Sequence, residues 1–156
     1  MVAEPSRRNP GLRLRAEDAE DLAVISAFLQ DALVSVRDLA YDPDARSFVL
    51  VVNRFRWERG GAAAKRAAFE RTLCAVSFTG VERVVYRGFR RSEEDQILAL
   101  LAISLAEVPG GAVIDLEFAG GATIRLAAAA LRCRAGDFGK PWRTARHPEH
   151  PVDEAP

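Results

Sequence analysis

Arginine and aromatic residues alternate in the segment Asn53–Trp57, the pattern in this chain best suited to chemistry. In an extended strand the alternation would place Arg54 and Arg56 on one face and the aromatic rings on the other. Guanidinium groups aligned on a sheet can hold phosphates, and exposed rings can stack on nucleotide bases. Together with two arginines of a later segment, they form a candidate interaction surface made of Arg54, Arg56, Trp57, Arg83 and Arg87.

The same segment also has a purely structural interpretation. Eight acids and one base lie within residues 16–45, whereas eleven bases and three acids lie within residues 46–91. Blocks of opposite charge can neutralise one another in a fold, so the arginines would pair with the acidic block while Phe55 and Trp57 enter the core. The net charge of zero favours this interpretation, because nucleic-acid-binding domains are usually basic.

The catalytic and cofactor motifs that the sequence suggests are all incomplete. Asp137-Phe138-Gly139 resembles the magnesium motif of kinases, but the glycine-rich loop and the His-Arg-Asp loop are missing. We therefore expect a turn whose Phe138 packs inward. Gly60-Gly61 and Lys65 lack the Gly-Lys-Ser/Thr ending of a phosphate loop, so we expect an ordinary connection there.

The two histidines give no support to a metal site or a hydrolase. His147 and His150 have a spacing that could bind a metal, but Pro148 and Pro151 surround them and no third ligand lies nearby. A Ser-His-Asp or Cys-His mechanism would have to recruit this polar tail. We expect no catalytic residue, no cofactor and no metal, and hence a protein that is not an enzyme.

The length of 156 residues predicts one domain. We expect a disordered arm over residues 1–10, a β-rich domain over residues 11–142 and a flexible polar tail over residues 143–156. The arm has no apolar stretch typical of a signal peptide. The longest apolar run, Ile97–Ala106, is far shorter than the ~20 residues of a membrane helix. Two cysteines in apolar segments read as buried thiols, so we expect a cytoplasmic protein without membrane contacts.

One helix stands out near the start of the chain. Asp18 is a suitable N-cap, and Leu22, Ile25, Leu29 and Leu33 recur at spacings of three and four. This pattern predicts an amphipathic helix of about four turns. Val24 and Phe28 would widen its apolar face.

Short strands fill the rest of the chain. Gly80 is expected to join strands 71–79 and 81–89 as a tight hairpin, and residues 119–122 to join strands 112–118 and 123–126. A further strand is expected to continue from residue 127 to residue 135. The pattern of Ile97–Glu107 suits either helix or strand, and the antiparallel rhythm around it favours a strand. Asp115 and Glu117 would share a face and meet Arg125 across the sheet.

These elements predict an α+β fold that is mostly antiparallel β. One N-terminal amphipathic helix would pack on a curled sheet, a roll or partial barrel, of about seven to eight strands.

Four segments are similar to an uncharacterised proteobacterial family catalogued as domain of unknown function 2948. They are Leu12–Asp18, Phe48–Trp57, Ala119–Leu126 and Asp137–Trp142. The resemblance spans the chain from about Leu12 to Trp142 and implies a single-domain bacterial protein. It implies no activity and no site residues.

The sequence therefore leads us to expect a non-enzymatic domain that binds an unknown macromolecule or associates with itself. One alternative is a nucleic-acid-contacting module that uses the arginine and aromatic strand. Another is a small-molecule or lipid carrier that holds its ligand inside the curled sheet.

Overall fold

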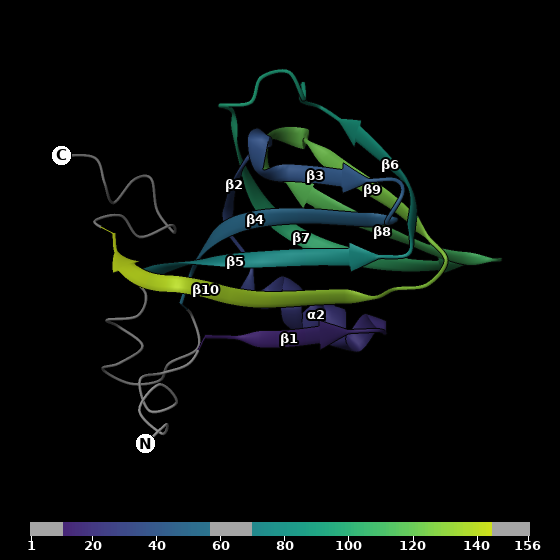
Figure 1. The fold of residues 1–156 in the computed structure, drawn as a ribbon, viewed down its shortest axis with the longest axis horizontal. Helices are drawn as coiled ribbons and strands as arrows, with labels where there is room; N and C mark the ends of the chain where they lie inside the picture. Colours follow the sequence, from purple (N-terminus) through teal and green to yellow (C-terminus); the bar gives the residue numbers. More distant parts are fainter. Residues whose placement is uncertain (1–10, 57–69, 145–156) are drawn as a thin grey trace.

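A computed structural model describes residues 11–56 and 70–144 of the chain (Figure 1). One sheet of ten strands dominates these residues, together with the α-helix α2 (Ala19–Phe28) and the 3-10 turns η1 (Val36–Asp38) and η2 (Ala119–Gly121). The strands are β1 (Arg13–Ala16), β2 (Leu33–Ser35), β3 (Leu39–Asp42), β4 (Ser47–Phe55), β5 (Glu70–Thr79), β6 (Val81–Arg87), β7 (Ile97–Val108), β8 (Gly111–Phe118), β9 (Thr123–Ala128) and β10 (Cys133–Arg143).

The sheet runs in the order β1-β10-β5-β4-β2-β7-β8-β9-β6, with β3 beside β4. Its pairs are antiparallel, as the sequence predicts. The described residues form ten strands rather than seven to eight. Part of the difference arises because η1 divides residues 33–42 into β2 and β3.

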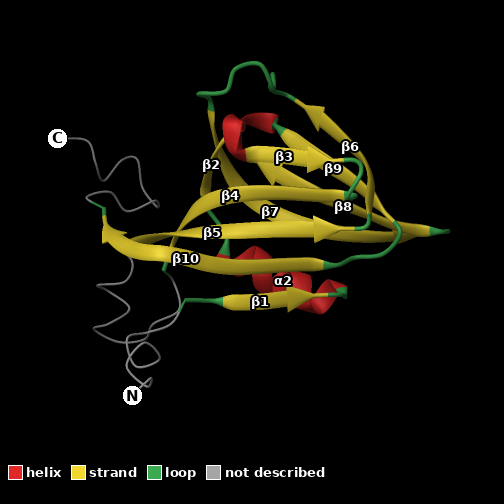
Figure 2. Ribbon diagram, in the orientation of Figure 1, coloured by secondary structure: helices red, strands yellow, loops and turns green. Residues whose placement is uncertain are grey.

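The sheet curls into two layers that share a core (Figure 2). The front layer contains β1, β10, β5, β4 and β3, and the back layer contains β7, β8, β9 and β6. The layers meet at β2, where Leu33 pairs with both Asn53 of β4 and Ala99 of β7. Large inward side chains of both layers are fully buried, among them Phe48, Leu50, Phe78, Leu100, Ile114, Leu116 and Ile124.

The curl does not close into a barrel. The end strand β6 returns toward the β3–β4 turn, where the Val81 N–H donates to the carbonyl of Arg46 at 2.9 Å. The Tyr41 hydroxyl donates to the carbonyl of Val81 at 2.8 Å. The sheet order nevertheless ends at β6, and β3 pairs with β4. The fold is therefore an open roll.

Helix α2 begins where the sequence predicts and ends earlier. The Asp18 carboxylate accepts the N–H of Asp21 at 2.8 Å, a standard N-cap bond. Leu22 and Ile25 are buried, and the Ser26 hydroxyl accepts the N–H of Ile103 in β7 at 2.9 Å. Val24 is 46% exposed, so the packed face is narrower than expected.

The helix ends at Phe28 instead of continuing to Leu33, as the leucine spacing predicted. Asp31 turns the chain with a φ of 65°. Leu33 then joins β2 and pairs with β4 and β7. Sheet pairing thus replaces the last helical turn.

The predicted hairpin around Gly80 is wrong. Gly80 has a φ of 76°, but it carries the chain from one layer to the other. β5 pairs with β4 and β10, whereas β6 pairs with β9. Two neighbouring strand patterns with a glycine between them do not reveal which partners each strand will choose.

Two other strand predictions are confirmed. Ile97–Glu107 lies within the strand β7, and β8 pairs with β9 around Gly120 and Gly121, whose φ angles are 82° and 90°. The continuous strand over residues 127–135 is wrong, because β9 ends at Ala128 and β10 begins at Cys133. No helix in the described residues is long and apolar enough to cross a bilayer.

Candidate functional site

Arg54, the first residue of the expected interaction surface, is buried within the front layer. Its exposed fraction is 0%. Its Nε donates to Asp137 Oδ1 at 2.9 Å and its Nη2 donates to Oδ2 at 2.6 Å. Its Nη1 donates to the carbonyl of Phe55 at 3.0 Å. The guanidinium is therefore engaged inside the protein, not presented to solvent.

Strand alternation explains this burial. Phe48, Leu50 and Val52 point into the core, and Arg54 continues the same inward row. On β10, Asp137 lies opposite Cys74 and faces the same interior, with a side chain 5% exposed. A charge taken out of water needs a partner with good geometry, and the two-pronged contact supplies it.

The placement of Asp137 corrects the prediction for Asp137-Phe138-Gly139. The motif lies in the strand β10, not in a turn. Because Asp137 points inward, the next side chain points outward, and Phe138 is 45% exposed. Asp137 also holds the start of β1, since its Oδ2 accepts the Leu12 N–H at 2.8 Å and its own N–H donates to the Leu12 carbonyl at 3.0 Å.

Arg56 is also removed from solvent. It is 7% exposed, and its Nη1 donates to Glu70 Oε1 at 2.5 Å. Phe55 is buried, but it is not part of the core cluster between the layers; the Arg71 guanidinium lies 3.7 Å from the centre of its ring. However, the acids that meet Arg54 and Arg56 are Asp137 and Glu70, neither of which belongs to the acidic block of residues 16–45.

The remaining expected residues lie elsewhere. Arg83 and Arg87 are exposed on β6 of the back layer, and Trp57 lies outside the described residues. Arg125 pairs with Asp115 across the β8–β9 ladder, with Nε to Oδ1 at 2.8 Å, as the sequence predicts. The structure therefore does not bring the four expected arginines into one surface.

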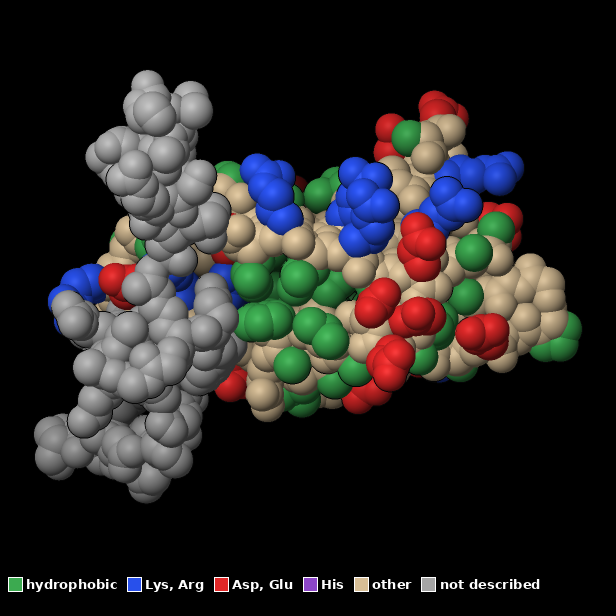
Figure 3. Space-filling model, turned by 90° about the horizontal axis from the view of Figure 1, so that it is seen from below, with side chains coloured by type: hydrophobic (Ala, Val, Ile, Leu, Met, Phe, Trp, Pro, Cys, Tyr) green, Lys and Arg blue, Asp and Glu red, His purple; other side chains and the backbone are tan. Residues whose placement is uncertain are grey.

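A different set of arginines does converge, on the outer face of the front layer. We call it the arginine cluster; it consists of Arg13, Arg15, Arg132 and Arg134. Arg15 lies directly opposite Arg134 in the β1–β10 ladder, and Arg13 lies opposite Gly136. All four arginines are exposed. Seen from below, basic side chains gather along one margin of the molecule, and acidic side chains lie mostly below them (Figure 3).

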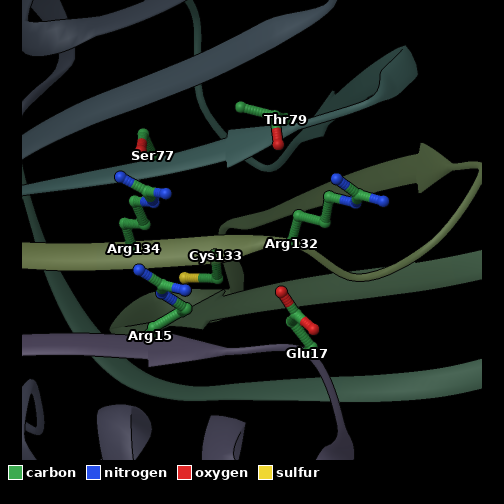
Figure 4. A pocket seen from close by; sticks show the side chains of 7 residues that line it. All are labelled: Arg15, Glu17, Ser77, Thr79, Arg132, Cys133 and Arg134. Carbon is green, nitrogen blue, oxygen red and sulfur yellow. The ribbon is translucent and has the colours of Figure 1, made fainter.

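Two adjoining pockets surround the arginine cluster. The first has a volume of about 340 Å³ and is lined by Arg15, Glu17, Ser77, Thr79, Arg132, Cys133 and Arg134. Figure 4 shows Arg15 extending from β1 toward β10, and Arg134 extending from β10 toward Ser77 of β5. The second pocket has a volume of about 320 Å³ and is lined by Arg13, Leu14, Arg15, Arg134, Ala135 and Gly136.

A family model described as a protein of unknown function, DUF2948, matches residues 12–150. The chain belongs to the DUF2948 family. This confirms the resemblance seen in the sequence. Searches of curated proteins and of solved structures each found no significant match to this DUF2948 protein.

Among the described residues of this DUF2948 protein, the arginine cluster has no ion-paired acid, although Glu17 lines the same pocket. Within residues 11–56 and 70–144, none of its four guanidinium groups forms an ion pair or a side-chain hydrogen bond. Like charges directly opposite one another in a sheet are destabilising, so Arg15 and Arg134 repel each other. An anion between them would remove that repulsion, and the hydroxyls of Ser77 and Thr79 could donate to it.

A local signal for this cluster does exist in the sequence of this DUF2948 protein. Arg13-Leu14-Arg15 and Arg132-Cys133-Arg134 each place two arginines on one side of a strand. The two segments lie at opposite ends of the chain, and nothing local shows that β1 and β10 are neighbours. Only the β1–β10 pairing reveals the site.

Neither a metal nor a reactive thiol centre emerges in the described part of the DUF2948 fold. No group of three or more His, Cys, Asp and Glu side chains there could hold a metal ion. Cys74 and Cys133 are free thiols, and they lie opposite Asp137 and Phe78 rather than opposite each other. Burial raises the pKa of each thiol to about 12, so both remain protonated at neutral pH.

Proposed function

We propose that this DUF2948 protein is a non-enzymatic binding module that docks an anionic partner on the arginine cluster. The observation that carries the proposal is the Arg15–Arg134 pair, two exposed guanidinium groups set opposite each other with no acid bound to either among the described residues. Placing two like charges opposite each other in a sheet lowers the stability of the fold, so stability does not explain the arrangement. A negatively charged partner would be attracted to the two guanidinium groups, which gives them a role in binding.

The two-layer interior favours surface binding over a carrier function. A continuous cluster of buried apolar side chains from α2 and both layers occupies the space where a carrier would hold its ligand. The two pockets at the arginine cluster lie at the surface. The first is lined mostly by charged and polar side chains, and the second by three arginines together with Leu14, Ala135 and Gly136. Such a lining suits an anion better than a lipid tail.

Chromatography on immobilised heparin, a general polyanion, tests this proposal. We expect the full-length protein to be retained at low salt and the R15S/R134S variant to elute at a clearly lower salt concentration. The matched control is R83S/R87S, which removes the same charge from the back layer and should elute with the wild-type protein. Equal shifts for the two variants, or no retention of the wild-type protein, would refute a role for this surface.

A further inference from the structure

We propose that the anionic partner is a single-stranded nucleic acid, whose phosphates lie on the arginine cluster and whose bases stack on Phe138 and Trp142. This inference rests on the proposed function and names its ligand. The feature behind it is strand β10, which carries arginines along its first part and exposed aromatic rings along its second.

The register of β10 against β5 places these groups on one face. Arg134 lies opposite Ser77, Phe138 opposite Leu73 and Trp142 opposite Arg71. These three residues of β5 are partly exposed, whereas Thr72, Cys74 and Val76, which alternate with them, point into the core. The arginine and both rings therefore lie on the outer face of the front layer, although a bulge interrupts the ladder between the rings.

The two rings are open to contact. Phe138 is 45% exposed and Trp142 is 41% exposed, although both belong to a strand of the sheet. Gly136 separates them from Arg134, and a Cβ built on it would meet nothing within 4 Å. At Gly136, therefore, no side chain stands on the outer face between Arg134 and the rings.

The distance between the arginines and the rings suits a short, extended stretch of single-stranded nucleic acid. Phe138 follows Arg134 by four positions, which corresponds to ~13 Å at the usual rise of a β-strand. A nucleic-acid backbone can run over such a distance within a few nucleotides, with its phosphates at the arginines and its next bases at the rings. Paired bases are stacked inside a duplex, so rings on a sheet surface can reach only unpaired ones.

An acidic peptide is the competing occupant, and the rings discriminate against it. Carboxylates would satisfy the arginine cluster, but glutamate and aspartate side chains have no π-face to stack on Phe138 or Trp142. The overall neutrality of the chain does not oppose the inference, because the basic side chains along one margin in Figure 3 lie mostly apart from the acidic ones. Binding of a polyanion depends on the local field of the docking face.

Fluorescence anisotropy with a labelled dT12 oligonucleotide at 50 mM salt tests the inference on the full-length protein. We expect binding that weakens steeply with salt, and a log–log salt slope that falls by about 1.4 in R15S/R134S if each arginine contacts one phosphate. We expect the Phe138→Leu variant, which keeps an apolar side chain, to bind about 5- to 150-fold more weakly through loss of stacking. Phe138→Tyr keeps the ring and should bind like the wild-type protein.

A second readout uses Trp142 itself. In a Trp57→Phe background Trp142 is the only tryptophan. Stacking predicts that dT12 quenches its fluorescence, whereas an abasic phosphodiester of equal length does not. Thermal unfolding of each variant checks that it folds.

The competing outcomes separate the inference from the proposed function. If poly-glutamate of twelve residues binds through Arg15 and Arg134, and dT12 does not bind, the ligand class is wrong but the anion-docking surface stands. If a twelve-base-pair duplex binds better than dT12 and Phe138→Leu has no effect, the stacking role is wrong. If neither dT12 nor poly-glutamate binds at 50 mM salt, both proposals fail.

Discussion

Arg54 and Asp137 show how strongly the environment of a residue decides what it does. Arg54 continues the row of inward-pointing apolar residues of β4, because every second side chain of a strand points to the same face. Its charge is therefore buried. Asp137 meets it from β10 and also binds the backbone of Leu12. The pair therefore ties β4, β10 and the start of β1 together. Neither residue is available for an external ligand.

Replacing Arg54 with Met tests this role at the residue scale. The substitution leaves the Asp137 carboxylate buried without its guanidinium, so we expect the free energy of unfolding to fall by ~3–5 kcal/mol. Urea denaturation provides the measurement. The matched control is Arg125→Met, which breaks the exposed Asp115–Arg125 pair and should leave the free energy of unfolding almost unchanged, because water screens an ion pair at the surface. Similar losses for both variants would contradict the structural role of the buried pair.

At the scale of elements, local patterns predict the kind of element better than its extent or its partner. Asp18 marks the start of α2, and apolar alternation marks β4 and β5. By contrast, the leucine spacing extends the helix past Phe28, into residues that pair as β2. The sequence pattern around Gly80 suits a hairpin, yet the two strands join different layers. Pairing with distant strands overrides the local preference in both cases.

The N-cap of α2 gives a prediction at this scale. Asp18→Ala removes the acceptor of the Asp21 N–H, and we expect the protein to lose ~1 kcal/mol of unfolding free energy. Asp18→Ser keeps a capping oxygen and should be nearly as stable as the wild-type protein. Chemical denaturation followed by circular dichroism measures both variants. If Ser and Ala lower stability equally, the cap does not act through its hydrogen bond.

At the scale of the whole molecule, the curl of the sheet creates both the core and the candidate site. It brings α2 and both layers around one apolar cluster, which includes Cys74 and Cys133. It also lays β1 against β10, so that arginines from the two ends of the chain meet. The surface proposed to bind nucleic acid is therefore a property of the complete fold.

The buried thiols make the stability of the molecule sensitive to alkaline pH. Burial raises the pKa of Cys74 and of Cys133 from 9.0 to about 12. Below pH 9 both thiols are protonated in the folded and unfolded states, so they add no pH dependence. Between pH 9 and 12 they ionise only in the unfolded state, and unfolding becomes easier as pH rises.

Urea denaturation at pH 8, 9.5 and 10.5 measures this effect. The C74A/C133A variant controls for other titrating groups, and we expect its stability to fall less over this pH range than that of the wild-type protein. At pH 8 iodoacetamide should label neither thiol in the folded protein. Labelling of the native protein at the rate of a free cysteine would show that the thiols are accessible.

The sequence by itself determined the features that depend on neighbours along the chain. These include an antiparallel, β-rich chain with one helix near its start, the Asp18 cap, the β8–β9 turn, the Asp115–Arg125 pair and the family. Each rests on periodicity, turn chemistry or motif content within a few residues.

Only the tertiary structure decided which strands pair and which faces are covered. It buried Arg54 and Arg56, exposed Phe138, and set Arg15 opposite Arg134 across most of the chain's length. The physical reason is that a strand has two equivalent sides and two free edges. Its own residues show the alternation, but residues far away in the chain determine which side meets the core and which edge meets a partner.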